Sequence, residues 1–74
     1  MTATLDARGL VCPLPVLKAR KALLSLPEGA VLTVYATDAQ APKDFLLFCE
    51  ENNYLLQKAE SVEQGFEIVI KKNE

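Results

Sequence analysis

The chain has 74 residues and a net charge of −2, and half of its residues are apolar, which indicates one small folded domain over residues 1–74 and argues against disorder. No apolar run approaches the roughly 20 residues of a transmembrane helix, and the first residues lack the basic and apolar regions of a signal peptide. We therefore expect a cytoplasmic protein that makes no contact with a membrane.

Few side chains in this sequence can carry chemistry. There are two cysteines and no histidine, which argues against a protein-only zinc site and excludes a Cys–His catalytic pair. In a reducing compartment both thiols stay free. We therefore expect no metal and no cofactor, and any activation of a cysteine must come from a helix dipole, nearby cations or a partner.

The charges are distributed unevenly along the chain. Residues 1–26 hold four basic side chains and one acidic one, for a net charge of +3. Residues 27–67 hold two basic and eight acidic side chains, for a net charge of −6. The region around Cys12 is therefore expected to be basic, which favours a thiolate or an acidic partner. The simpler alternative is that these cations only solvate a helix face.

The first half of the chain predicts a strand at residues 3–7 and a helix at residues 13–26. Gly9 permits a sharp bend between them, and Pro13 and Pro15 are tolerated because N–H groups in a first helical turn have no intrahelical partner. The apolar residues of this helix that recur at helical spacing are Val16, Ala19, Ala22, Leu23 and Leu26.

Residues 30–37 predict a second strand, rich in β-branched residues, with Leu32, Val34 and Ala36 on its inner side. Asp38 is a good N-cap for a second helix over residues 39–52. The inner face of that helix is expected to contain Ala41, Phe45, Phe48 and Cys49.

Residues 54–60 and 66–72 predict a closing hairpin with a turn at residues 61–65. The βαβαββ order implies parallel first and second strands and a two-layer α+β sandwich, with two helices on one face of a four-stranded mixed sheet. Both helices begin at the edge where the parallel strands end, and open sheets commonly bind ligands there. Cys12 and residues 38–44 are therefore expected to be neighbours.

The two cysteines are expected to differ in role. Cys12 precedes the first helix at the positive end of its dipole, which favours the nucleophilic thiolate, although a small helix-capping residue is the open alternative. Cys49 lies on an apolar helix face and is expected to be buried as a small hydrophobe. A separation of about 15 Å along the second helix excludes a disulfide, which needs Cα atoms within about 7 Å.

Residues 5–15, with the sequence LDARGLVCPLP, resemble the signature of the TusA/SirA-like sulfur-carrier family around its C-P-x-P core. The similarity continues through residues 16–21 and returns in residues 36–38 and 43–45. The resemblance implies a fold similar to the C-terminal domain of translation initiation factor three.

The resemblance also implies a function. Cys12 would accept sulfane sulfur as a persulfide and relay it to an acceptor protein, as a sulfurtransferase-type carrier without stand-alone catalysis. The donor would be a protein such as a cysteine desulfurase or a rhodanese. The pathway would be tRNA thiolation, sulfur oxidation, molybdenum-cofactor synthesis or selenium metabolism. A carrier that presents one cysteine to successive partners is expected to be a monomer and to bind no nucleic acid directly.

The same resemblance assigns roles to residues around Cys12. Gly9, Pro13 and Pro15 would shape the opening of the first helix, and Arg8 would steer a donor or steady a persulfide anion. Some family members have an acidic residue at the position of Leu14. Here Leu14, with Leu17 near it, would form a small apolar docking patch beside the sulfur, and the alternative is that its apolar character is incidental. The residues of the expected partner surface are Arg8, Leu14, Lys18, Asp38, Lys43 and Asp44. The alternatives are helix capping by Asp38, plain surface charge at Lys43 and Asp44, and plain solvation of Arg8.

Three other functions compete with the carrier. The first is a non-catalytic interaction domain that acts as a regulator, in which Cys12 is only a helix cap. The second is nucleic-acid binding, which the acidic net charge and the lack of an aromatic platform disfavour. The third is a thiol redox protein, which would need the resolving cysteine of a C-x-x-C motif.

Overall fold

The computed structural model describes residues 1–72 and has the predicted βαβαββ order. Its elements are β1 (Thr2–Ala7), α1 (Leu14–Leu24), β2 (Val31–Ala36), α2 (Ala41–Asn52), β3 (Leu55–Val62) and β4 (Gly65–Lys71). Neither helix in this part of the chain is long and apolar enough to cross a membrane.

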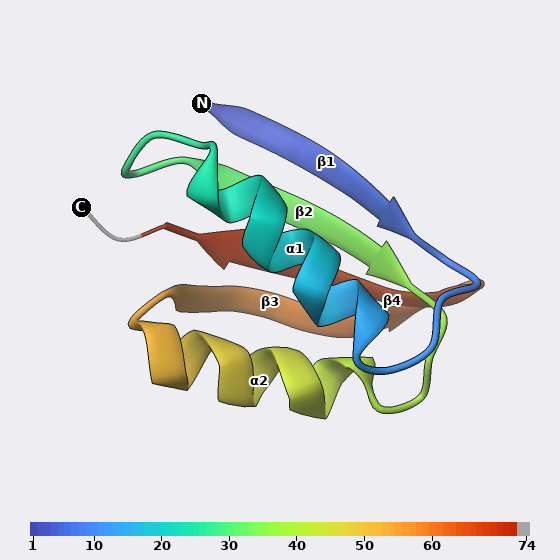
Figure 1. Ribbon diagram of the computed structural model, residues 1–74. Helices are drawn as coiled ribbons and strands as arrows, with labels where there is room; N and C mark the ends of the chain where they lie inside the picture. The colour runs from blue at the N-terminus through green and yellow to red at the C-terminus, as the bar shows by residue number, and fades with distance from the viewer. Residues whose placement is uncertain (73–74) are drawn as a thin grey trace.

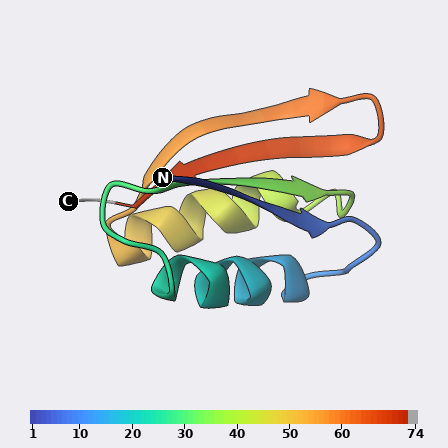
Figure 2. The ribbon, with the colours of Figure 1, turned by 90° about the horizontal axis from the view of Figure 1, so that it is seen from above.

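The four strands form one mixed sheet in the order β1-β2-β4-β3. Strands β1 and β2 are parallel, whereas β4 runs antiparallel to both β2 and β3. Both helices cover the same face of the sheet (Figure 1), and the view from above shows them as a separate layer (Figure 2). The predicted two-layer α+β sandwich is therefore confirmed.

The core lies between the helices and the sheet. The predicted inner face of α2 is buried at all four positions, and Ala19 and Leu23 of α1 are fully buried. The other three residues predicted for the inner face of the first helix are partly buried and pack against this core. Leu32, Val34, Ile68 and Ile70 supply the sheet side. Removal of this apolar surface from water, at about 25 cal/mol per Å², is what holds the two layers together.

The start of α2 differs from the prediction. Asp38 is not its N-cap: the helix begins at Ala41, and Gln40 occupies the capping position. Asp38 instead forms a turn in front of the helix, because its Oδ1 accepts the N–H of Gln40 at 3.2 Å and its carbonyl oxygen accepts the N–H of Ala41 at 3.0 Å. At the other end, Asn53 closes the helix in a left-handed conformation, with φ of 59°.

Helix α1 ends at Leu24, two residues before its predicted end. The last turn is closed by Ser25, whose hydroxyl donates to the carbonyl oxygen of Ala22 at 2.9 Å. Lys72 then donates to the carbonyl oxygens of Leu23 and Leu26 at 2.7 and 2.8 Å. A cation at the C-terminal end of a helix complements the helix dipole, so the residue that follows β4 also stabilises α1.

The hairpin between β3 and β4 is tighter than predicted. The expected turn over residues 61–65 is wrong at both ends, because β3 continues to Val62 and β4 starts at Gly65. Gly65 has φ of +125°, and a Cβ atom there would lie 2.3 Å from the carbonyl oxygen of Ala36. Only glycine permits this close approach between β4 and the end of β2.

We expect Gly65→Ala to destabilise the fold by about 3 kcal/mol, since it combines backbone strain with a steric clash. Gly9→Ala is the matched control. Gly9 also has a positive φ, of +83°, but no atom would lie within 4 Å of an added Cβ, so its cost should be about 1 kcal/mol. Urea unfolding of both variants measures the difference, and equal losses would contradict the close-approach explanation.

Candidate functional site

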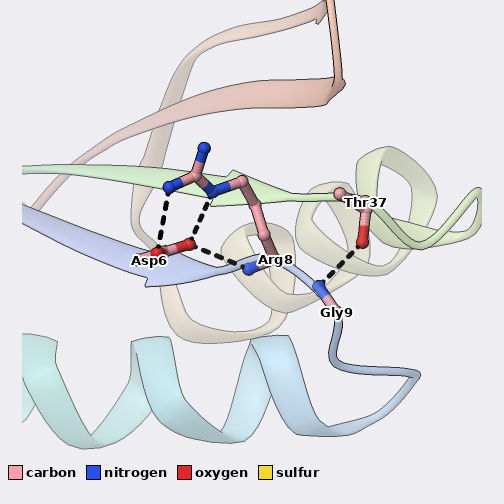
Figure 3. A network of polar contacts seen from close by, with 4 residues as sticks. All are labelled: Asp6, Arg8, Gly9 and Thr37. Carbon is pink, nitrogen blue, oxygen red and sulfur yellow. Dashed lines mark hydrogen bonds and ion pairs between the residues drawn. The ribbon is translucent and has the colours of Figure 1, made fainter.

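Two loops meet at the edge of the sheet where β1 and β2 end. Ala7 and Ala36 pair at the ends of these parallel strands, so the loops that follow them start side by side. The N–H of Gly9 donates to Thr37 Oγ1 at 2.9 Å (Figure 3), and the N–H of Cys12 donates to Asp38 Oδ2 at 2.7 Å. The predicted proximity of Cys12 to residues 38–44 is confirmed.

Cys12 is exposed and lies in the loop immediately before α1. Pro13, joined to it by a cis peptide bond, occupies the N-cap position, and the helix starts at Leu14. Pro15 is in the first turn, where its ring is buried against the core. The prolines therefore open the helix as predicted, and they leave the thiol of Cys12 just outside it.

Asp38 joins the cysteine loop, residues 8–13, to the start of α2. One carboxylate oxygen accepts the N–H of Gln40 and the other accepts the N–H of Cys12. Hydrogen bonds to an ionised carboxylate are shorter and stronger than those between neutral groups. The main chain at Cys12 is thereby fixed relative to both helices.

A groove of about 250 Å³ runs from Cys12 between the two helices. Its apolar surface comes from Pro13 and Val16 on one side and Leu47 and Phe48 on the other. Two carboxylates, those of Asp44 and Glu51, complete the lining. The thiol therefore lies in a groove that is apolar in part and acidic in charge.

The acidic groove contradicts the predicted preference of Cys12 for the thiolate form. The pKa of its thiol is raised, first by a hydrogen bond to the carboxylate of Asp44, then by partial desolvation and by the negative charges of Asp44 and Asp38. The expected basic surroundings and lowered pKa are wrong, because the nearest charges come from the segment after β2 and not from residues 1–26. Thiolate at Cys12 is thus scarcer than in an ordinary cysteine.

Arg8 lies apart from this groove. Its Nε and a terminal nitrogen donate to the two carboxylate oxygens of Asp6 at 2.9 and 3.1 Å (Figure 3), which lowers the pKa of Asp6 to about 2. Arg8 lines a second hollow, also of about 250 Å³, together with Tyr35, Val62, Glu63, Gln64 and Phe66. Its role toward a donor stays a prediction.

Apolar side chains are exposed in the loop that contains Cys12 and on α1. Leu14 and Leu17 are 43% and 53% exposed, and Val11 is 67% exposed. The remaining residues of the expected partner surface, Lys18 on α1 and Lys43 on α2, are also exposed. These positions are compatible with contact to a partner, and their roles stay predictions.

The second cysteine is placed as expected. Cys49 is buried in the core, and burial raises the pKa of its thiol to about 11. Both cysteines are free thiols. Within residues 1–72, no three His, Cys, Asp or Glu side chains gather where they could hold a metal ion. Cys12 is therefore the thiol that solvent and partners can reach.

Sequence reasoning missed Leu47 and Glu51 as parts of the site. A signal was present, since Asp44, Leu47 and Glu51 recur at intervals of three and four residues and so share one face of α2. The sequence does not show that α1 lies beside this face of α2, because that arrangement depends on how the two helices pack on the sheet.

Removing the charge of Asp44 should restore reactivity to Cys12. At a fixed pH below the pKa of the thiol, a lower pKa means more thiolate, so Asp44→Asn should react severalfold faster with the neutral reagent iodoacetamide and shift the pH–rate profile to lower pH. Glu50→Gln, an exposed change on α2 that does not line the groove, is the control. Unchanged profiles in both variants would show that Asp44 does not control the thiol.

Comparison with known proteins shows the family of the chain. A model of the family described as Sulfurtransferase TusA matches residues 3–72. A putative sulfur carrier protein of Neisseria meningitidis is 48% identical over 67 residues, which are 90% of each chain. The sulfur carrier protein TusA of Allochromatium vinosum is 42% identical over 69 residues, which are 93% of this chain and 91% of that one.

A solved structure of a similar protein has the same fold. The crystal structure of a SirA-like protein from Desulfitobacterium hafniense superposes with a TM-score of 0.85 and 34% identity, covering 97% of this chain and 99% of the other. The sequence signature, the exposed cysteine before α1 and these comparisons lead to one conclusion: the chain belongs to the TusA family of sulfur carrier proteins.

Proposed function

We propose that Cys12 accepts sulfane sulfur from a donor protein as a persulfide and passes it to an acceptor protein. The observation that carries this proposal is an exposed free thiol whose main chain is fixed by Asp38 at the edge where the parallel strands end. A carrier must present its sulfur to two partners in turn, and an accessible side chain on a fixed backbone meets that need.

The transfer is a thiol exchange in which atoms and electrons balance. The Cys12 thiolate attacks the outer sulfur of a cysteine persulfide on the donor, a new S–S bond forms at Cys12, and the S–S bond of the donor breaks. The donor cysteine leaves as a thiolate and takes up the proton that Cys12 has lost. Delivery repeats the exchange, with the acceptor thiolate attacking the outer sulfur on Cys12. Neither step needs an external oxidant.

The relay requires two protein partners. A cysteine desulfurase or a rhodanese would supply the sulfur, and the acceptor would belong to tRNA thiolation or to another sulfur-trafficking route. The carrier would act in the cytoplasm. It would act as a monomer, because a second copy bound over Cys12 would obstruct both exchanges. The acidic net charge of −2 supports protein partners over direct binding to nucleic acid.

A regulatory interaction domain is the second candidate. The exposed patch of Val11, Leu14 and Leu17 favours it, because clustered apolar side chains on a surface often mark a protein interface. On this alternative Cys12 is only a loop residue, and Cys12→Ser would keep every activity. The carrier, in contrast, loses all transfer in that variant.

Incubation of the reduced protein with a cysteine desulfurase and cysteine should add one sulfur to the Cys12 peptide. Mass spectrometry of the intact protein and its peptides, before and after treatment with a reductant, measures the adduct and its reversal. The adduct should be absent in Cys12→Ser. It should persist in Cys49→Ser, because Cys49 is buried.

A missing adduct with the desulfurase leads to a second donor, a rhodanese charged with thiosulfate. No adduct with either donor, in a protein whose Cys12 is also unreactive toward iodoacetamide, would overturn the carrier mechanism. The regulatory domain would then be the better description.

A further inference from the structure

The charge around Cys12 has the opposite sign to that of the N-terminal part of the chain. Asp44 and Glu51 line the groove that starts at Cys12, and an oxygen of Asp38 lies 2.7 Å from the main-chain nitrogen of Cys12. The basic residues of α1, in contrast, are not among the residues that line this groove; they are Lys18, Arg20 and Lys21. A group approaching Cys12 along the groove therefore meets negative charge.

The size and surface of the groove indicate what can occupy it. Its volume of about 250 Å³ is below the roughly 300–1,000 Å³ of pockets that enclose small-molecule ligands. It suits one or two side chains of a docked protein segment. Leu47 is 48% exposed in the groove wall, so an apolar group placed there would be removed from water together with it.

We propose that the groove between α1 and α2 selects a cationic sulfur donor, an inference that rests on the proposed function. The donor segment places a lysine or arginine beside its persulfide cysteine, against Asp44 and Glu51, and an apolar side chain against Leu47. The chemistry of the occupant is thus fixed by the two kinds of surface in the groove, carboxylate and aliphatic.

A cation in this position also assists the exchange. Paired with the carboxylate of Asp44, it offsets the negative charge that disfavours a thiolate at Cys12. The thiol then ionises when the correct donor is bound, and its proton passes to the cysteine that leaves the donor. An anionic donor meets Asp38, Asp44 and Glu51 with no such compensation.

Three small thiosulfonates test the selectivity without any partner protein. They carry a methyl group, a trimethylammonioethyl group or a sulfonatoethyl group, and are neutral, cationic and anionic. Each reacts in the same way: the Cys12 thiolate attacks the divalent sulfur, a disulfide forms, and methanesulfinate leaves. Because all three consume the same thiolate, the ratio of the cationic to the anionic rate constant is independent of the pKa of the thiol.

The measurement uses the Cys49→Ser protein, and the ratio is divided by that of N-acetylcysteine amide under the same conditions. We expect a normalised ratio of about ten at low ionic strength, falling as salt is added. Asp44→Asn and Glu51→Gln should each lower the ratio severalfold. Glu50→Gln, which removes the same charge from an exposed position outside the groove, should lower it much less.

The outcomes separate this inference from the proposed function. A normalised ratio of one or below, in a protein that still takes up sulfur on Cys12 from a donor, overturns the cationic selectivity and leaves the carrier intact. An equal loss of selectivity in Glu50→Gln and Glu51→Gln also overturns it, because net charge and not the groove would then be responsible. Selectivity without any persulfide on Cys12 overturns the carrier, and with it the assignment of the groove to a sulfur donor.

Discussion

The hydrogen bond from the N–H of Cys12 to Asp38 is the interaction on which the site depends. It joins two loops that are 26 residues apart in the chain and that meet only because β1 and β2 are parallel neighbours. The cysteine loop contains Gly9, the residue type that loses most conformational freedom on folding. Contacts to Thr37 and Asp38 hold this loop in one arrangement, and the thiol is thereby presented in a fixed place without being buried.

The carboxylates that organise the site also restrain its chemistry. Asp38 positions the main chain of Cys12, and Asp44 lines the groove beside the thiol, yet both carboxylates raise the pKa of that thiol. A protonated thiol is a poor nucleophile and is less prone to oxidation. In the proposed relay this would be a useful compromise, since Cys12 would have to remain intact between partners and react once a partner is bound. The site therefore combines a fixed main chain at Cys12 with a raised pKa of its thiol.

The sequence predicted the fold well where one regular pattern decides the structure. The helical spacing of Ala41, Phe45, Phe48 and Cys49 identified the buried face of α2, and the alternation in residues 30–37 identified β2. The predicted start of α2 was wrong because Asp38 binds two different segments of the chain. Asp38 is a favourable helix cap by residue type, but its second oxygen binds Cys12, and α2 starts three residues later. The residues around Asp38 do not indicate its contact with Cys12, which lies 26 residues away in the chain.

The electrostatics of Cys12 could not be obtained by counting charges along the chain, because charges act through space. Residues 5–15 build the loop and place the thiol, whereas the carboxylates and much of the apolar wall come from α2. The position of the thiol and the proposed choice of its donor are therefore encoded in different segments, whereas Asp44 on α2 acts on both the pKa of the thiol and the charge of the groove. If the groove selects the donor as proposed, changes at Leu47 and Glu51 would alter the donor without moving Cys12, since neither residue contributes to the hydrogen bond that positions Cys12.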